Sequence, residues 1–271
     1  MNYKEERRAK RKAKREAMCQ YVSEHRRVFI IYMLLRVSVI FIAVAQFFNQ
    51  NYENLFLCIL VLMLLTLPGF IETNYHIDLP DTLEIIILLF IYAAEILGEV
   101  RSFYTIYPFW DTMLHTLNGF LAAAIGFSLV DLLNRNKKLT FELSPFFMAV
   151  VAFCFSMTIG VLWEFFECMM DVFVGFDMQK DAIVTSIHSV LLHPEGLNKV
   201  VSIENIQNTI VNGQDLGING YLDIGLLDTM KDLFVNFIGA AVFSVIGYFY
   251  VKNRGKGKFA RRFIPQVLDE K

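Results

Sequence analysis

One histidine and several carboxylates stand in otherwise apolar segments of this sequence, and they are the side chains best suited to chemistry. His115 follows Asp111 by four residues, Glu164 and Glu167 are three apart, and Asp232 stands in a third apolar segment. Residues three or four apart share one face of a helix. Each pair should therefore present its polar groups together.

These residue types indicate two kinds of chemistry. Oxygen ligands from Asp and Glu suit hard cations such as Mg²⁺, Mn²⁺ or Ca²⁺, and one histidine extends the choice to zinc, manganese or iron. The expected cofactor is a divalent metal whose identity stays open, with Asp111, His115, Glu164, Glu167 and Asp232 as candidate ligands. Alternatively, Glu164 and His115 are catalytic residues that exchange protons with a substrate. The spacings Glu-x-x-His and His-Glu-x-x-His are absent, so no established metal signature is present.

Further polar side chains recur at helical spacing near these five and are expected to support them. Asp111 and Asp228 also fit the start of a helix, where an aspartate caps free N–H groups. Asp171 also fits a solvated position at the level of the lipid head groups. The supporting polar residues are Glu95, Asn118, Asp171, Asp228 and Asn236.

The composition defines the class of protein. The chain has 271 residues, of which 55% are hydrophobic and 19% charged, and its mean hydropathy is +0.46. Soluble domains average about 45–50% apolar and about 25% charged residues. Disorder is excluded by the apolar content, and the pI of about 6.2 argues against a nucleic-acid partner. Four scattered cysteines without a CxxC do not make a disulfide scaffold. A multi-pass membrane protein remains.

About six spans follow from the rule that a transmembrane helix needs about 20 mostly apolar residues. The expected fold is an all-α, polytopic transmembrane helix bundle. A basic arm (residues 1–27) precedes the transmembrane domain (28–252), and a basic tail (253–271) follows it. The six spans are Val28–Phe48, Leu55–Ile71, Leu83–Val100, Asp111–Leu133, Pro145–Val174 and Leu226–Val251.

The basic residues predict the orientation of these spans. Seventeen of the 25 Lys and Arg residues lie in the first 27 positions or from Lys252 onward. Because cytoplasmic segments are enriched in Lys and Arg, both termini are expected in the cytoplasm. With this orientation, the ends of four spans bring His115 and the eight carboxylates at those ends into the outer half of the membrane: Glu95, Glu99, Asp111, Glu164, Glu167, Asp171, Asp228 and Asp232. Charges at this depth are costly and are functional by default.

A long outer loop, residues 175–225, joins the last two spans. Ile183, Val184 and Ile187 recur at helical spacing, as do Val200, Ile203 and later residues. We therefore expect short amphipathic helices on the outer membrane surface. Such a loop could cover a site beneath it or serve as a plain surface cap.

Three segments carry a family resemblance: FYTIYPFWDTMLHTLNGFL (Phe103–Leu121), FCFSMTIGVLWEFFE (Phe153–Glu167) and GLLDTMKDLFVNFIGA (Gly225–Ala240). In these segments the sequence resembles the uncharacterised bacterial inner-membrane YjdF-type family. The Asp-x-x-x-His segment is also similar, over a short stretch, to VanZ-like membrane proteins. The resemblance implies a multi-pass protein of the bacterial cytoplasmic membrane and implies no established reaction.

Three functions stay open. The first is an enzyme that acts on a lipid or envelope precursor at the outer leaflet, with a metal or with acid–base residues. The second is a proton- or cation-coupled transporter that uses the same carboxylates as its ion site. The third is a structural or partner-binding membrane protein whose polar cluster fixes helix packing. Membrane lipid is the expected partner, together with a lipid or small-molecule substrate.

Overall fold

The computed structural model describes residues 22–23, 25–75, 77–134, 143–253 and 257–267. Most of the basic arm predicted at 1–27, part of the tail predicted at 253–271 and the basic loop at 135–142 lie outside these residues. Helices make up most of the described chain. The α-helices are α2 (Arg26–Phe48), α3 (Tyr52–Leu64), α4 (Leu67–Tyr75), α5 (Asp81–Ile91), α6 (Phe103–Ile106), α7 (Trp110–Asn134), α8 (Pro145–Met169) and α9 (Leu226–Lys252). Two π-helical segments, η1 (Tyr92–Val100) and η2 (Met170–Val174), extend α5 and α8.

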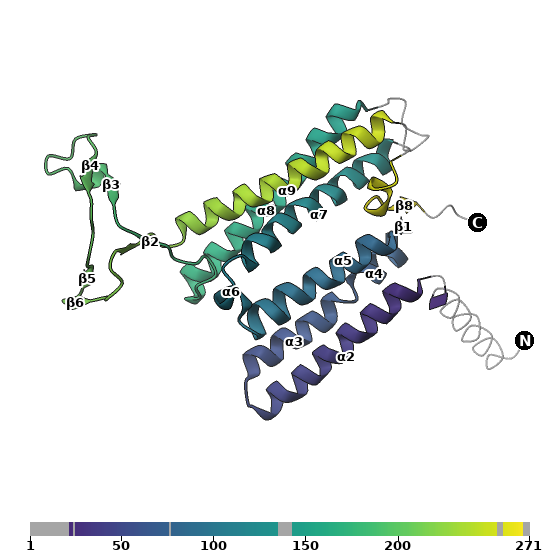
Figure 1. The fold of residues 1–271 in the computed structure, drawn as a ribbon, viewed down its shortest axis with the longest axis horizontal. Coiled ribbons are helices and arrows are strands. Elements are labelled where there is room, and N and C mark those ends of the chain that lie inside the picture. Colours follow the sequence, from purple (N-terminus) through teal and green to yellow (C-terminus); the bar gives the residue numbers. More distant parts are fainter. Residues whose placement is uncertain (1–21, 24, 76, 135–142, 254–256, 268–271) are drawn as a thin grey trace, which may run out of the picture.

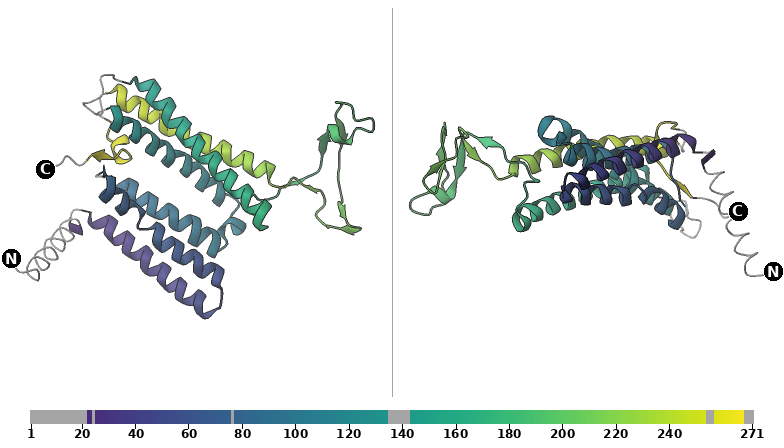
Figure 2. Two further views of the ribbon diagram at one scale, coloured as in Figure 1. Left: turned by 180° about the vertical axis from the view of Figure 1, so that it is seen from behind. Right: turned by 90° about the horizontal axis from the view of Figure 1, so that it is seen from below.

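The long helices form two groups of three that lie side by side (Figure 1). One group consists of α7, α8 and α9, which pack closely on one another, and the other consists of α2, α3 and the continuous α5–η1 helix. We call the end where the 175–225 segment joins α8 and α9 the loop end. The opposite end, where α2 begins and α9 ends, is the terminal end. The same arrangement is visible from two further directions in Figure 2.

Five helical segments are long and apolar enough to cross a membrane: Arg26–Phe48, Tyr52–Asn74, Trp110–Asn134, Pro145–Val174 and Leu226–Lys252. They coincide with five of the predicted spans to within a few residues. The second is divided, because α3 ends before Thr66 and α4 begins at Leu67. The continuous α5–η1 helix, residues 81–100, matches the remaining predicted span in position but carries four acidic residues. Its place as a sixth span stays a prediction.

Glycines set the close contact within the α7–α8–α9 group. A Cβ at Gly119 would overlap the backbone of Asn236, and a Cβ at Gly239 would overlap the backbone of Thr116. Gly160 on α8 faces the side-chain amide of Asn236 in the same way. Small residues let membrane helices approach closely. α7 and α9 therefore meet backbone to backbone just below the loop end, and α8 packs there on the side chain of Asn236.

The segment between α8 and α9 consists of short strands, so the prediction of amphipathic helices is wrong. Its strands are β2 (Ile183–Val184), β3 (Ile187–Ser189), β4 (Val201–Ile203), β5 (Ile210–Val211), β6 (Gln214–Asp215) and β7 (Tyr221–Leu222), and one 3₁₀ turn, η3 (Val190–Leu192), follows β3. They pair antiparallel as β2–β7, β3–β4 and β5–β6. The β-branched Ile and Val residues favour strands. Asn205, Asn212 and Asn219 adopt positive φ and turn the chain between them.

A small two-stranded sheet closes the terminal end. Strand β1 (Ile77–Asp78) pairs antiparallel with β8 (Gln266–Val267), and the 3₁₀ turn η4 (Ala260–Arg262) lies before β8. Phe263 stacks edge to face on Phe120 of α7 and on Phe243 of α9. Residues 260–264 therefore pack between the two helix groups at this end (Figure 1).

Candidate functional site

His115 is the centre of a buried polar cluster at the loop end of α7, α8 and α9. Its Nε2 atom lies 3.4 Å from Oδ1 of Asp111, one turn earlier on the same helix. Its Nδ1 atom lies 3.8 Å from Oε1 of Glu164, which α8 contributes. The imidazole is thus placed between two carboxylates from different helices.

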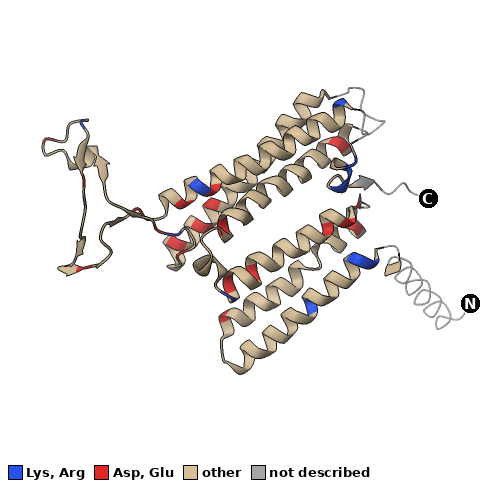
Figure 3. Ribbon diagram, in the orientation of Figure 1, with Lys and Arg blue, Asp and Glu red and all other residues tan. Residues whose placement is uncertain are grey.

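Two overlapping groups of three could each hold a metal ion. In Asp111, His115 and Asp232, one potential ligand atom from each residue lies within 4.8 Å of the others. The same is true of His115, Glu164 and Glu167. All five predicted ligands therefore meet at one place, although they come from three helices. Figure 3 shows acidic residues of these helices gathered at the loop end.

Lys231 supplies the positive charge for one side of the cluster. Its Nζ atom donates to Oδ1 of Asp228 at 2.7 Å and to Oδ2 of Asp111 at 3.5 Å, and it lies 3.6 Å from Oδ1 of Asp232. Because these acids belong to α7 and α9, the lysine bridges the first turns of two helices. Asp111, Asp228 and Asp232 therefore have a cation of the protein itself beside them.

Among the residues that the structure describes, the carboxylates of α8 have no such lysine. Glu164 is 4% exposed, and within this part of the chain neither of its side-chain oxygens has a hydrogen-bond partner, although Thr229 and Gln179 lie nearby. Glu167 is 8% exposed and accepts one hydrogen bond, at 2.8 Å, from Nε1 of Trp163. A buried charged group without a partner is costly. This side of the cluster is the one that lacks a counter-charge other than His115.

The geometry fits a metal ion at His115, Glu164 and Glu167 better than at the group that contains Asp232. A ligating histidine usually gives its second ring N–H to a carboxylate, which fixes the ring orientation. Asp111 is placed to accept from Nε2–H of His115, and this leaves Nδ1 free to face Glu164 and Glu167. The residues that could hold the ion are therefore His115, Glu164 and Glu167, with Asp111 as the orienting partner.

Asn118 and Asn236 lie deeper and serve the helix contact. Asn118 donates from Nδ2 to Oδ1 of Asn236 at 3.3 Å, and Asn236 donates from Nδ2 to the carbonyl of Ser156 at 3.5 Å. The Ser156 hydroxyl in turn donates to the Gly119 carbonyl at 2.7 Å. These bonds join all three helices under the cluster. We therefore interpret both asparagines as its structural support.

Asp171 and Asp228 hold the stem of the long loop. Asp171 accepts the backbone N–H groups of Met178 and Gln179, at 2.6 Å and 2.8 Å, and Asp228 accepts that of Lys180 at 3.0 Å. Asp228 lies in the first turn of α9, as expected, but the N-cap of that helix is Gly225. Two of the predicted supporting residues thus bind backbone that lies beside the cluster.

Asp223 completes this stem, and the sequence pattern did not single it out. Its two carboxylate oxygens accept the N–H groups of Ala182 and Leu227, each at 2.7 Å. Slight burial raises the pKa of Asp223, but these backbone donors outweigh it and hold the pKa below its ordinary value. With the β2–β7 pair, they close the stem where the loop meets α9.

Tyr104 and Trp163 are not among the predicted site residues, but both lie beside the acidic region. Tyr104 of α6 packs on Gly98, whose Cβ would overlap its ring. Burial, reinforced by the nearby carboxylates of Glu99 and Asp111, raises the pKa of Tyr104 far above its ordinary value. Its phenol is therefore a neutral O–H donor among carboxylates. Only the fold brings α6 to this place, so spacing could not have identified it.

Glu95 belongs to a different element from the rest of the cluster. It lies in the π-helical segment η1, on the helix group that contains α2 and α3, and its ionisable neighbours include Glu99 and Tyr104. Neither of the two groups of three that could hold a metal ion includes it. The structure therefore places Glu95 beside the cluster and not within it.

Together, these features define a helical membrane protein with a buried acidic–histidine group near one end of its helices. The chain belongs to a family of predicted membrane proteins of unknown function (DUF2238), whose model matches residues 30–253. No curated protein and no solved structure matches the chain. The family agrees with the membrane class expected from the sequence and assigns no reaction.

Proposed function

We propose that the loop-end cluster binds one divalent cation through His115, Glu164 and Glu167 and acts on the polar head of a lipid or envelope precursor. The observation that supports this most directly is the Glu164 carboxylate, which is buried without a hydrogen-bond partner. An ion beside it would supply the missing counter-charge. The bound cation would polarise a substrate oxygen or activate a water molecule.

The proposed location is the outer face of the bacterial cytoplasmic membrane. The bias of Lys and Arg toward the two ends of the sequence supports cytoplasmic termini. The loop end, opposite the start of α2 and the end of α9, would then face outward. A head group at the outer surface would reach the cluster through its rim, where Asp111 is 25% exposed and Lys231 is 43% exposed.

Metal content tests the binding half of the proposal. Wild type, Glu164→Gln and His115→Gln are purified in detergent without chelator, offered single divalent metals and analysed by elemental mass spectrometry. Glu99→Gln is the matched control, because Glu99 is an exposed carboxylate at the same end. We expect about one equivalent of metal in wild type and in the control, and a loss in the other two variants. Wild type without metal, or Glu164→Gln with metal, contradicts the proposal.

A cation-coupled carrier is the second candidate, and the same variants distinguish it. Below Asn236, the α7–α8–α9 group contains an apolar core that includes Phe127, Ala240 and Phe243, all fully buried. The same helices also bury the polar side chains of Ser128, Ser244 and Asp131 nearer the terminal end. An enzyme should change a lipid in a bacterial extract, and Glu164→Gln should not. A carrier should instead give metal- or pH-dependent uptake into liposomes that Glu164→Gln abolishes.

A further inference from the structure

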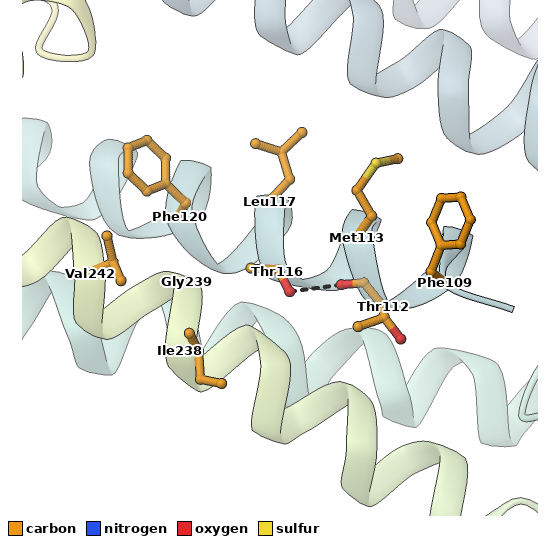
Figure 4. Close-up of a pocket in the computed structure, with 9 residues that line it drawn as sticks. All are labelled: Phe109, Thr112, Met113, Thr116, Leu117, Phe120, Ile238, Gly239 and Val242. Carbon is orange, nitrogen blue, oxygen red and sulfur yellow. Dashed lines mark hydrogen bonds between the residues drawn. The ribbon is translucent and has the colours of Figure 1, made fainter.

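We propose that a groove between α7 and α9 binds a single hydrocarbon chain of a membrane lipid, at a site separate from the polar cluster. The groove has a cavity volume of about 520 Å³, within the range of about 300–1,000 Å³ that is usual for ligand sites. It lies on the side of these helices that faces the other helix group (Figures 1 and 4). Its lining residues are Phe109, Thr112, Met113, Thr116, Leu117, Phe120, Ile238, Gly239 and Val242.

The walls of the groove offer almost only hydrocarbon. Figure 4 shows Met113, Leu117 and Phe120 of α7 projecting on the same side as Phe109, which directly precedes this helix. The Thr116 hydroxyl donates back to the Thr112 carbonyl at 2.7 Å, so this hydroxyl is not available to bind a ligand in the groove. Gly239 packs closely against the backbone of Thr116, and the side chains around this contact form the walls of the groove. An apolar chain can fill this space, whereas a polar ligand would find few partners.

Its length and depth match one half of a bilayer. From Phe109 to Phe120 the groove follows eleven residues of chain, which at 1.5 Å per helical residue is about 16 Å. Half of a hydrocarbon core is about 15 Å thick. The groove begins at the loop end beside Asp111 and stops where Phe120 stacks on Phe243 and Phe263. A lipid chain from the leaflet at the loop end would therefore fit with its tip against these rings.

The groove is structurally independent of the polar cluster. Its lining positions on α7 lie on the face opposite Asp111, His115 and Asn118, because they are offset by about half a helical turn. At the loop end, Trp110 joins α7 to the other helix group by donating from Nε1 to the Ala93 carbonyl at 3.3 Å. The lipid site can consequently exist whether or not the cluster binds a metal.

Photolabelling tests the lipid site. The full chain is reconstituted with phosphatidylglycerol that carries a diazirine midway along one acyl chain, and labelled peptides are mapped by mass spectrometry. Met113→Trp fills the groove, and Met169→Trp is the control, since Met169 is also an exposed methionine near the loop end but lies on α8. We expect labelling of Ile238 and Val242 to fall about tenfold in Met113→Trp and to stay unchanged in Met169→Trp.

Three results would overturn the proposal. The first is labelling of the groove no stronger than that of Leu162, an exposed position on α8 that reports contact with bulk lipid. The second is unchanged labelling in Met113→Trp. The third is a cross-link between two copies of the chain through this face, which would make it a protein interface. If Met113→Trp does not fold, Val242→Trp fills the groove from α9 and takes its place in the same comparison.

Discussion

Replacing Glu164 by glutamine should change stability in opposite directions with and without metal. In chelator, wild type contains a carboxylate that is 4% exposed and has no hydrogen-bond partner. An unsatisfied buried polar group costs about 1–3 kcal/mol, and more when it is charged. Glutamine has nearly the same shape and no charge. Glu164→Gln should therefore be as stable as wild type in chelator, or more stable by about 1–3 kcal/mol.

Metal should reverse this order. A ligand that binds only the folded state stabilises it by about 2.7 kcal/mol when its concentration is 100 times Kd. At about 2–4 °C per kcal/mol for a chain of this size, the Tm of wild type should rise by roughly 5–11 °C. Glu164→Gln has lost one of three ligands and should shift by much less. Wild type should then be the more stable protein.

The assay is thermal unfolding in detergent, with matched samples in chelator and in a single divalent metal. Glu99→Gln should follow wild type in both conditions, because Glu99 is exposed and outside both metal-binding groups. The reasoning is refuted if Glu164→Gln lowers Tm by the same amount in both conditions. That result would mean that Glu164 supports the fold without a cation.

Three further predictions concern the fold around the site. Gly239→Ala should destabilise the protein by about 1–3 kcal/mol in denaturant unfolding, because its Cβ would overlap backbone of α7, whereas Gly69→Ala, with open space around it, should cost nothing. Partial burial lowers the pKa of His25, but its 2.5 Å contact with Asp81 outweighs burial and raises the pKa. The stabilisation from the His25–Asp81 contact should be complete below about pH 6.5 and should be lost as pH rises through the raised pKa of His25. His25→Gln should therefore flatten the dependence of Tm on pH above about pH 6.5. Finally, Asp223→Asn should speed hydrogen exchange in the loop stem by about 5–30-fold, because one of two backbone N–H groups loses its acceptor; exchange equal to wild type would exclude this role.

The sequence was sufficient to predict the helices and the end at which the acids gather. Apolar runs of spanning length located five membrane-capable helices to within a few residues. Spacing along single helices then grouped Asp111 with His115 and Glu164 with Glu167. The prediction that these pairs meet required only that successive helices alternate in direction. This is why Asp232, which is remote in the sequence, was correctly placed with them.

Two kinds of information could not be obtained from spacing. The first is the role of each acid: Asp171 and Asp228 resemble Glu164 in the sequence, but they accept backbone N–H groups of the loop, which depend on how that loop folds. The second is the fold of the 175–225 segment itself. Its apolar residues follow a helical period, but the segment folds as pairs of short strands, with positive-φ turn residues such as Asn205 and Asn212 between them.

Because its stem is closed, the 175–225 segment is an insertion between α8 and α9. Asp171, Asp223 and Asp228, together with the β2–β7 pair, bring the ends of α8 and α9 together before the chain extends further. The residues between Thr185 and Gly220 are joined to the helices through this stem. Cleavage by a protease within it, or its replacement by a short turn, should leave the helices in register. Evolution could likewise lengthen, shorten or exchange this appendage while the membrane-embedded part stays the same.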